Sequence, residues 1–133
     1  MKLILVACFL FASGTTHAAD WLSLGKAEDG NSESFVDRST IAVVVSVRSA
    51  RFKYVLKHHI DMYKTRWIER SEAFSEYDCK RKTTHAIELI IYLEGGDTHS
   101  VPLPAEWQAV KAPWDQVALN YLCAWQGDQG AAD

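Results

Sequence analysis

The stretch Arg70–Leu93, RSEAFSEYDCKRKTTHAIELIIYL, decides the fold of this chain. Its second half predicts a β-strand over Thr83–Leu93. Alternation places the odd-numbered residues from Ile87 to Leu93 on one face and the even-numbered residues from Ala86 to Tyr92 on the other. The mature chain as a whole predicts an antiparallel sheet followed by one helix.

Cys79 ends the first half of this stretch, and Cys123 is its only candidate partner in the mature chain. A bridge between them would close a loop of 123 − 79 = 44 residues. The chain-entropy relation gives about 4 kcal/mol of stabilisation for such a loop. We therefore expect a disulfide that ties the middle of the sheet to a short helix near the C-terminus.

Residues 1–18 have the features of a secretory signal peptide. A basic start, Met1-Lys2, precedes the apolar run Leu3–Ala12, and small residues before Ala18 indicate cleavage after it. We expect an exported protein, periplasmic or on the outer surface of a bacterial cell. The apolar run is too short to span a bilayer, and no later run is long enough, so no transmembrane segment is expected.

A second reading of the N-terminus concerns Cys8. The sequence Leu5–Cys8 fits the box after which bacterial lipoproteins are cut and acylated. Few apolar residues precede Cys8, however, and Phe9–Phe11 continue the run beyond it. We therefore do not expect a lipid anchor at Cys8.

Composition indicates one small domain. Removal of residues 1–18 leaves 133 − 18 = 115 residues and a formal charge of 13 − 17 = −4. This length suits one domain, over 19–125, with 126–133 as a disordered polar tail. The negative balance argues against nucleic acid as the partner.

The first half of the mature chain predicts short strands and turns. Trp21–Leu24 and Ser32–Val36 would be strands joined by a turn at Glu28–Asn31. The short polar residues Asp37–Thr40 would form a second turn. The apolar residues of Ala42–Leu56 change parity near Arg48, which indicates a β-bulge or sharp bend inside one strand.

The second half predicts the remaining strands and the helix. Lys57–Tyr63 would be a connection, Thr65–Cys79 a long strand, and Thr98–Leu103 a short strand after the turn at Gly95–Asp97. A helix is expected from Pro113, a residue that suits the first helical position, to about Trp125.

The aromatic residues of this helix leave two interpretations open. Trp114, Tyr121 and Trp125 share one arc, and Cys123 lies nearly opposite its centre. If the disulfide draws the Cys123 side onto the sheet, the aromatic arc is left for a second protomer or another partner. Alternatively, the helix unwinds before Cys123 and all the aromatic residues belong to the core.

The sequence offers no set of residues typical of an enzyme, and we expect neither a cofactor nor a metal. With both mature cysteines bridged there is no free thiol, and no nucleophile elbow, phosphate loop or Cys-x-x-Cys pair occurs. A Ser39, His85 and Asp37 set can be assembled as in most chains of this size. His58-His59 with Asp61 has no third ligand at a recognisable spacing.

A basic and aromatic strip is the best candidate for a partner surface. Two readings are open: a surface for an acidic partner, or cations that protect exposed strand edges from pairing. Together with the helix aromatics, the candidate residues are Arg51, Lys53, Lys57, Lys64, Arg66, Trp67, Trp114, Tyr121 and Trp125.

Five motifs in order give the mature chain a family resemblance. They are Ala19-Asp20-Trp21, Phe35-Val36-Asp37-Arg38-Ser39-Thr40-Ile41, Glu76-Tyr77-Asp78-Cys79-Lys80, Pro104-Ala105-Glu106-Trp107-Gln108 and Tyr121-Leu122-Cys123. In order and spacing the chain resembles the surface-adhesin protein E family.

The resemblance implies a fold and a class of function. The fold is α+β: a single antiparallel sheet of about six strands packed on one C-terminal helix, with a cysteine pair linking the two. The function is binding of a host matrix or serum protein, with dimerisation of a kind known in the family. The alternative is a periplasmic structural or accessory protein with a partner in the bacterial envelope. This sequence differs from the family pattern in lacking a well-placed lipidation box.

Overall fold

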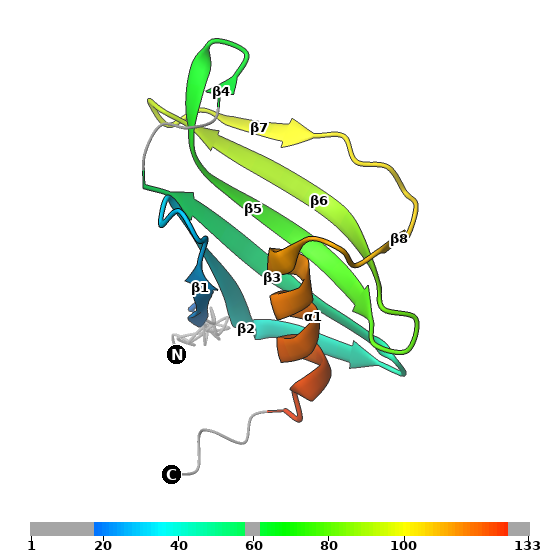
Figure 1. Ribbon diagram of the computed structural model, residues 1–133. Helices are drawn as coiled ribbons and strands as arrows, with labels where there is room; N and C mark the ends of the chain where they lie inside the picture. Colours follow the sequence, from blue (N-terminus) through cyan, green and yellow to red (C-terminus); the bar gives the residue numbers. More distant parts are fainter. Residues whose placement is uncertain (1–17, 58–61, 128–133) are drawn as a thin grey trace, which may run out of the picture.

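One antiparallel sheet, covered on one face by a C-terminal helix, makes up the fold (Figure 1). The structure is a computed structural model that describes residues 18–57 and 62–127. Its class is α+β, as the sequence predicts. The helix lies over only part of the sheet, so the rest of that face is not covered by any helix of the described residues.

The sheet is a meander in which neighbours in sequence are neighbours in space. Its main path runs in the order β1-β2-β3-β5-β6-β7, and the two-residue strands β4 and β8 pair with β5 and β6. The six strands of the main path agree with the predicted number. The strands are β1 (Trp21–Lys26), β2 (Ser32–Val44), β3 (Val47–Leu56), β4 (Met62–Tyr63), β5 (Arg66–Asp78), β6 (Thr83–Leu93), β7 (Thr98–Val101) and β8 (Gln108–Ala109).

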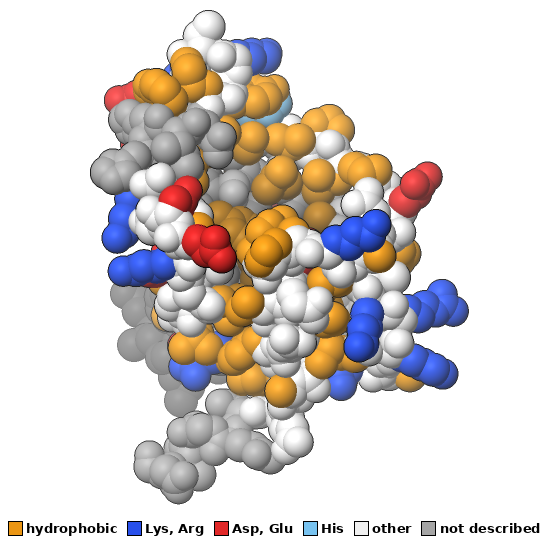
Figure 2. Space-filling view, viewed as in Figure 1, with side chains coloured by type: hydrophobic (Ala, Val, Ile, Leu, Met, Phe, Trp, Pro, Cys, Tyr) orange, Lys and Arg blue, Asp and Glu red, His pale blue; other side chains and the backbone are white. Residues whose placement is uncertain are grey.

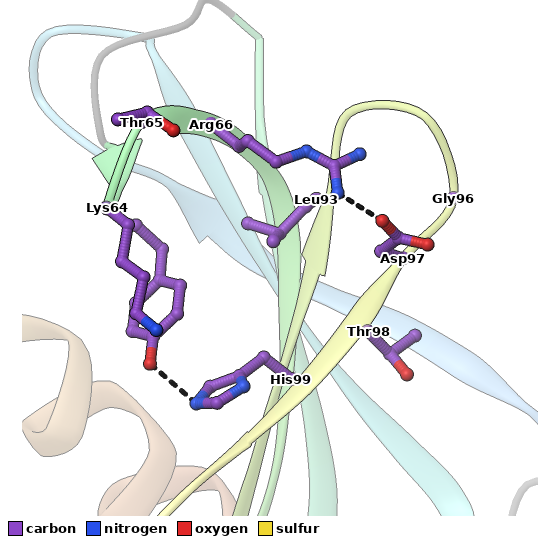
Figure 3. Close-up of a pocket in the computed structure, with 9 residues that line it drawn as sticks. Lys64, Thr65, Arg66, Leu93, Gly96, Asp97, Thr98 and His99 are labelled. Carbon is purple, nitrogen blue, oxygen red and sulfur yellow. Dashed lines mark hydrogen bonds and ion pairs between the residues drawn. The ribbon is translucent and has the colours of Figure 1, made fainter.

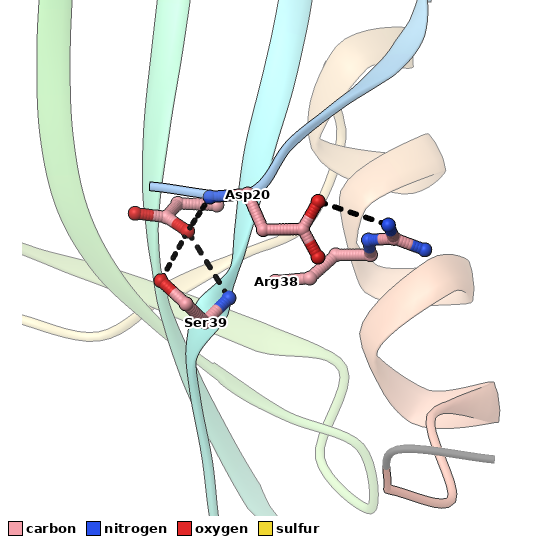
Figure 4. Close-up of polar contacts among 4 residues, drawn as sticks. Asp20, Arg38 and Ser39 are labelled. Carbon is pink, nitrogen blue, oxygen red and sulfur yellow. Dashed lines mark hydrogen bonds and ion pairs between the residues drawn. The ribbon is translucent and has the colours of Figure 1, made fainter. Parts of the chain in front are cut away.

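The predicted turn at Asp37–Thr40 is wrong, because β2 continues through it as a bulge. The Asp37 carboxylate is buried and accepts hydrogen bonds from the Asp20 N–H at 2.9 Å and from the Ser39 N–H at 3.0 Å (Figure 4). The Ser39 hydroxyl donates to the same oxygen at 2.6 Å. The short polar side chains thus satisfy the backbone of a bulge, as they would that of a turn.

The change of parity within Ala42–Leu56 comes from a hairpin, and the prediction of one bent strand is wrong. Val44 pairs with Val47, and the chain reverses through Val45, which has a positive φ of 56°. Two residues separate the paired Val44 and Val47, so even-numbered positions of β2 face the same side as odd-numbered positions of β3 near the turn. The alternation of apolar residues therefore shifts by one position without a bulge. The sequence lacks the Asn or Gly that usually marks such a turn.

The predicted span of β6 is confirmed, but its alternation is broken at Ile87. Phe74 pairs with Glu88 and Ser75 pairs with Ala86, so Ile87 has no partner in the register. Ala86 therefore faces the same way as Leu89, and Ile87 is exposed. A one-residue bulge reverses the predicted faces on one side of it.

The core lies between the helix and the middle of β2, β3 and β5. Helix α1 (Pro113–Ala124) begins at Pro113, as expected. The buried cluster consists of Val36, Ala50, Phe52 and Tyr77 from the sheet and Ala118, Leu119 and Leu122 from the helix.

The Cys79–Cys123 disulfide is confirmed, with 5.7 Å between the two Cα atoms. It joins the loop after β5 to the last turn of α1. Because the helix continues to Ala124, the interpretation in which it unwinds before Cys123 is wrong.

We expect removal of this bridge by the double substitution Cys79→Ala and Cys123→Ala to lower the free energy of unfolding by about 4 kcal/mol. The bridge closes a loop of 44 residues, and its loss restores conformational freedom to the unfolded chain. Urea unfolding of oxidised wild type, reduced wild type and the variant would measure the effect. An unchanged transition midpoint would contradict this account.

Candidate binding surfaces

An apolar groove lies beside the helix on the concave face of the sheet. Its volume is about 1130 Å³, and it extends between α1, the uncovered part of β3, β5 and β6, the β1–β2 turn and the segment before β8. Figure 2 shows apolar side chains around the hollow beyond the N-terminal end of the helix. The groove exists because the helix ends before it has covered the sheet.

Small side chains form the floor of the groove. Ser71, Ala73 and Ser75 of β5 and Ala86 of β6 line it. Larger side chains would fill this space, so these residues create the hollow. Tyr54, Leu56, Ile68, Leu89, Ile91, Trp114 and Val117 supply its apolar walls.

The N-terminal end of the helix is held against the sheet by Tyr77 and Tyr54. The Tyr77 hydroxyl donates a hydrogen bond of 2.7 Å to the Asp115 carboxylate. The ring of Tyr54 meets that of Trp114 edge-on, with 5.4 Å between the centroids. Trp114 is nevertheless 53% exposed, so it presents an aromatic surface at the mouth of the groove.

Burial raises the pKa values of this cluster. Desolvation raises the pKa of Tyr77 and of Tyr54 above the ordinary phenol value, so both stay neutral. Desolvation also raises the pKa of Asp115, and the hydrogen bond from Tyr77 partly offsets this. The cluster is a packed anchor for the helix.

The opposite, convex face of the sheet, which no helix of the described residues covers, carries cations beside aromatic rings. Lys53 on β3 places its Nζ atom 4.3 Å from the ring centroid of Trp21 and 5.0 Å from that of Phe35. The guanidinium of Arg70 lies 3.7 Å from the ring centroid of Tyr92. We call Trp21, Phe35, Lys53, Arg70 and Tyr92 the convex patch.

One acidic residue, Glu72, lies close to two of the cations on the convex face. Glu72 lies 3.8 Å from Arg51 and 3.7 Å from Arg70, and it accepts a hydrogen bond from the Tyr92 hydroxyl at 3.3 Å. Lys53 faces aromatic rings, and none of the described ion pairs involves it. Unlike Arg51 and Arg70, it has no carboxylate partner among the described residues.

A polar pocket of about 620 Å³ lies at the far end of the sheet, between the β4–β5 and β6–β7 turns (Figure 3). Arg66 forms an ion pair with Asp97 and donates a hydrogen bond to the carbonyl of Glu94. The Tyr63 hydroxyl lies 2.6 Å from His99 Nε2, and their rings stack. These contacts join the two turns and use the side chains that line the pocket.

The structure divides the predicted partner surface among separate regions. Arg51 and Lys53 lie on the convex face, and Lys57 is exposed just beyond β3. Lys64, Arg66 and Trp67 belong to the β4–β5 hairpin. On the opposite side, Trp114 and Tyr121 belong to the helix, and Trp125 follows its last residue. They do not form one continuous surface.

Two parts of the candidate surfaces were missed in the sequence. The first is the set of rings on the convex face, namely Trp21, Phe35 and Tyr92. Alternation along each strand places them on the same face as Lys53, but this can be inferred only when the pairing register between the strands is known. The small residues of the groove floor alternate along β5, yet small residues in a strand indicate no cavity by themselves.

The other candidates from the sequence do not come together. The Ser39 hydroxyl donates to Asp37 on β2, whereas His85 is on β6, where its ring lies 5.4 Å from that of Trp107 at a tilt. Strands β3 and β5 lie between β2 and β6 in the sheet. His58, His59 and Asp61 lie outside the described residues. Among residues 18–57 and 62–127, no group of three His, Cys, Asp or Glu side chains is placed to hold a metal ion. In the same residues, no helix is long and apolar enough to cross a membrane.

Comparisons with known proteins support the fold. A sequence model of the family described as surface-adhesin protein E matches residues 21–124. Crystal form II of Haemophilus influenzae protein E is 12% identical, with a TM-score of 0.58 over 77% of this chain and 87% of that chain. The selenomethionine form is 11% identical, with a TM-score of 0.56 over 84% and 91%. No curated protein matches this chain significantly.

We expect Tyr77→Phe to lower the free energy of unfolding by about 1–2 kcal/mol, because Asp115 loses its donor in a half-buried site. In the wild type this hydrogen bond lowers the pKa of Asp115, so its loss in the variant should raise that pKa further. A raised carboxyl pKa means that stability falls as pH rises through it. The deficit of the variant should therefore be larger near about pH 7 than near about pH 3.

Tyr92→Phe is the matched control for this prediction. It removes a hydrogen bond of 3.3 Å from a phenol to a carboxylate on the convex face, where Glu72 also has two arginines nearby. We expect it to cost less than about 0.5 kcal/mol. Equal losses for the two variants at both pH values would contradict the anchoring role of Tyr77.

Proposed function

Because this chain belongs to the surface-adhesin protein E family, we propose that it is an exported, adhesin-like protein that binds a host matrix or serum protein through the convex patch. Family and fold favour binding over catalysis. The observation that carries the proposal is Lys53, whose charge lies over Trp21 and Phe35 on the face without a helix.

The convex patch has the chemistry of a protein-binding surface. Aromatic residues and arginine are the residue types that contribute most to binding free energy, and Trp21, Tyr92 and Arg70 supply them on rigid strands. Lys53 adds a charge whose hydration is already reduced by two rings. An acidic segment of a partner suits this arrangement, because charge complementarity speeds association and sets orientation.

The groove favours a second candidate function, that of a periplasmic accessory protein with a partner in the bacterial envelope. Trp114 lies at the groove's mouth and is 53% exposed. An apolar segment of an envelope protein seated beside it would bury this ring. The two candidates use opposite faces of the sheet, so single substitutions distinguish them.

We expect Lys53→Glu to weaken binding to an immobilised matrix or serum protein by at least about tenfold, since it places a repelling charge between the two rings. The affinity of the purified mature protein would be measured by surface plasmon resonance at two salt concentrations. Lys26→Glu makes the same charge change at the rim of the groove, on β1. Equal losses in both variants, or binding that Trp114→Ala alone abolishes, would contradict the convex patch as the binding site.

Cell fractionation with surface protease treatment and intact mass of the recovered protein tests the location. Protein accessible to protease at the surface of intact cells is the result expected from a host-binding function. Protein found solely in the periplasm, with a mass that begins at Ala19, would overturn host binding and favour the envelope partner.

A further inference from the structure

The turn between β2 and β3 presents three valines to solvent. Val43 is 51% exposed, Val44 is 68% exposed and Val45 is 91% exposed. We call Val43, Val44 and Val45 the valine tip. Scattered exposed apolar residues are ordinary on a protein surface, but three consecutive ones at the apex of a hairpin form a protruding apolar point.

The backbone of the tip makes the choice of valine more unusual. Val45 has a φ of 56°, a region that β-branched residues rarely adopt and that Asn or Gly occupies at low cost. Its side chain is almost wholly exposed, so packing within the protein does not offset this cost. Val45 is thus unfavourable for the turn and does not pack in the core, which indicates that its side chain contacts something outside the molecule.

Cations lie beside the tip. The Cys79 N–H donates to the Ser46 carbonyl at 2.8 Å, which places the turn after β5 beside the hairpin. That turn carries Lys80, Arg81 and Lys82, all exposed. Arg48 donates a hydrogen bond from Nη1 to the Val45 carbonyl at 2.9 Å. Figure 2 shows Lys and Arg side chains projecting where these two turns lie in Figure 1.

One acidic residue, Asp78, lies next to these cations. The Asp78 carboxylate accepts hydrogen bonds from the N–H groups of Lys80 and Arg81 and from the Ser46 hydroxyl. It is thus used to fold the turn. The ammonium and guanidinium groups of Lys80, Arg81 and Lys82 form no ion pair among the described residues.

We propose that this end of the molecule docks on an anionic phospholipid bilayer, with the valine tip in the headgroup boundary and the surrounding cations on lipid phosphates. An apolar point with cations beside it matches the two layers of a bilayer surface, in which apolar chains lie beneath the phosphates. A protein partner is less well matched, because an apolar knob at a protein interface needs a pocket on the partner to receive it.

The experiment is sedimentation of the mature protein with vesicles of phosphatidylcholine alone or with phosphatidylglycerol added. We expect binding to the anionic vesicles, with weakening by salt, and little binding to the neutral ones. Lys80→Gln with Arg81→Gln should weaken binding by about fivefold per charge, on the order of 25-fold in all. Lys57→Gln with Lys64→Gln removes the same charge from the opposite end of the long strands, where both side chains are exposed, and should leave binding to vesicles unchanged.

Val44→Thr with Val45→Asn tests the tip independently. Asn tolerates the positive φ of this turn, so the variant should fold at least as well as the wild type, which circular dichroism would verify. We expect it to lose binding at a salt concentration where the wild type still sediments. The proposal is overturned if anionic vesicles do not bind the wild type, if the Lys80 and Arg81 variant binds like its charge-matched control, or if the Val44 and Val45 variant binds like the wild type. It is also overturned if the valine variant instead abolishes self-association, which would make a second copy of this chain the occupant.

Discussion

The Cys79–Cys123 bridge is the constraint on which the arrangement of the two layers depends. It fixes the last turn of α1 beside the end of β5, while Tyr77 and Asp115 hold the first turn against the same strand. A helix of 12 residues is about 18 Å long, whereas a strand of 13 residues is about 43 Å long. A helix held at both ends therefore covers less than half of β5, and the groove is the part left over.

Strand parity then divides the functional residues between two faces. Phe52 enters the core under the helix, so its neighbours Arg51 and Lys53 must face the other way. The same rule sends Ala73 to the groove and Glu72 and Phe74 to the convex face. The apolar groove and the charged, aromatic face thus lie on opposite sides of the same strands. A substitution on one face leaves the side chains of the other face in place.

The sequence was sufficient to predict the elements that have a strong periodic or chemical signal. It was insufficient to predict features that depend on the local backbone conformation, such as bulges and tight turns. Thr83–Leu93, the Pro113 helix start and the disulfide were predicted because alternation, a fixed φ and a single available thiol each allow one solution. The bulge at Ile87 and the hairpin at Val45 were missed, because no Gly or Asn marks either position. The convex patch required the strand register, which local patterns do not contain.

The places of the convex patch and the valine tip in the fold make their two roles compatible. The tip lies where β2 meets β3, and the β4–β5 hairpin lies at the opposite end of the long strands (Figure 1). If the tip rests on a bilayer, strands of this length carry that hairpin about 40 Å away from it. The convex face runs along the strands between these ends. It would then stand roughly upright from the membrane, where a large protein partner can approach Lys53 without displacing the tip.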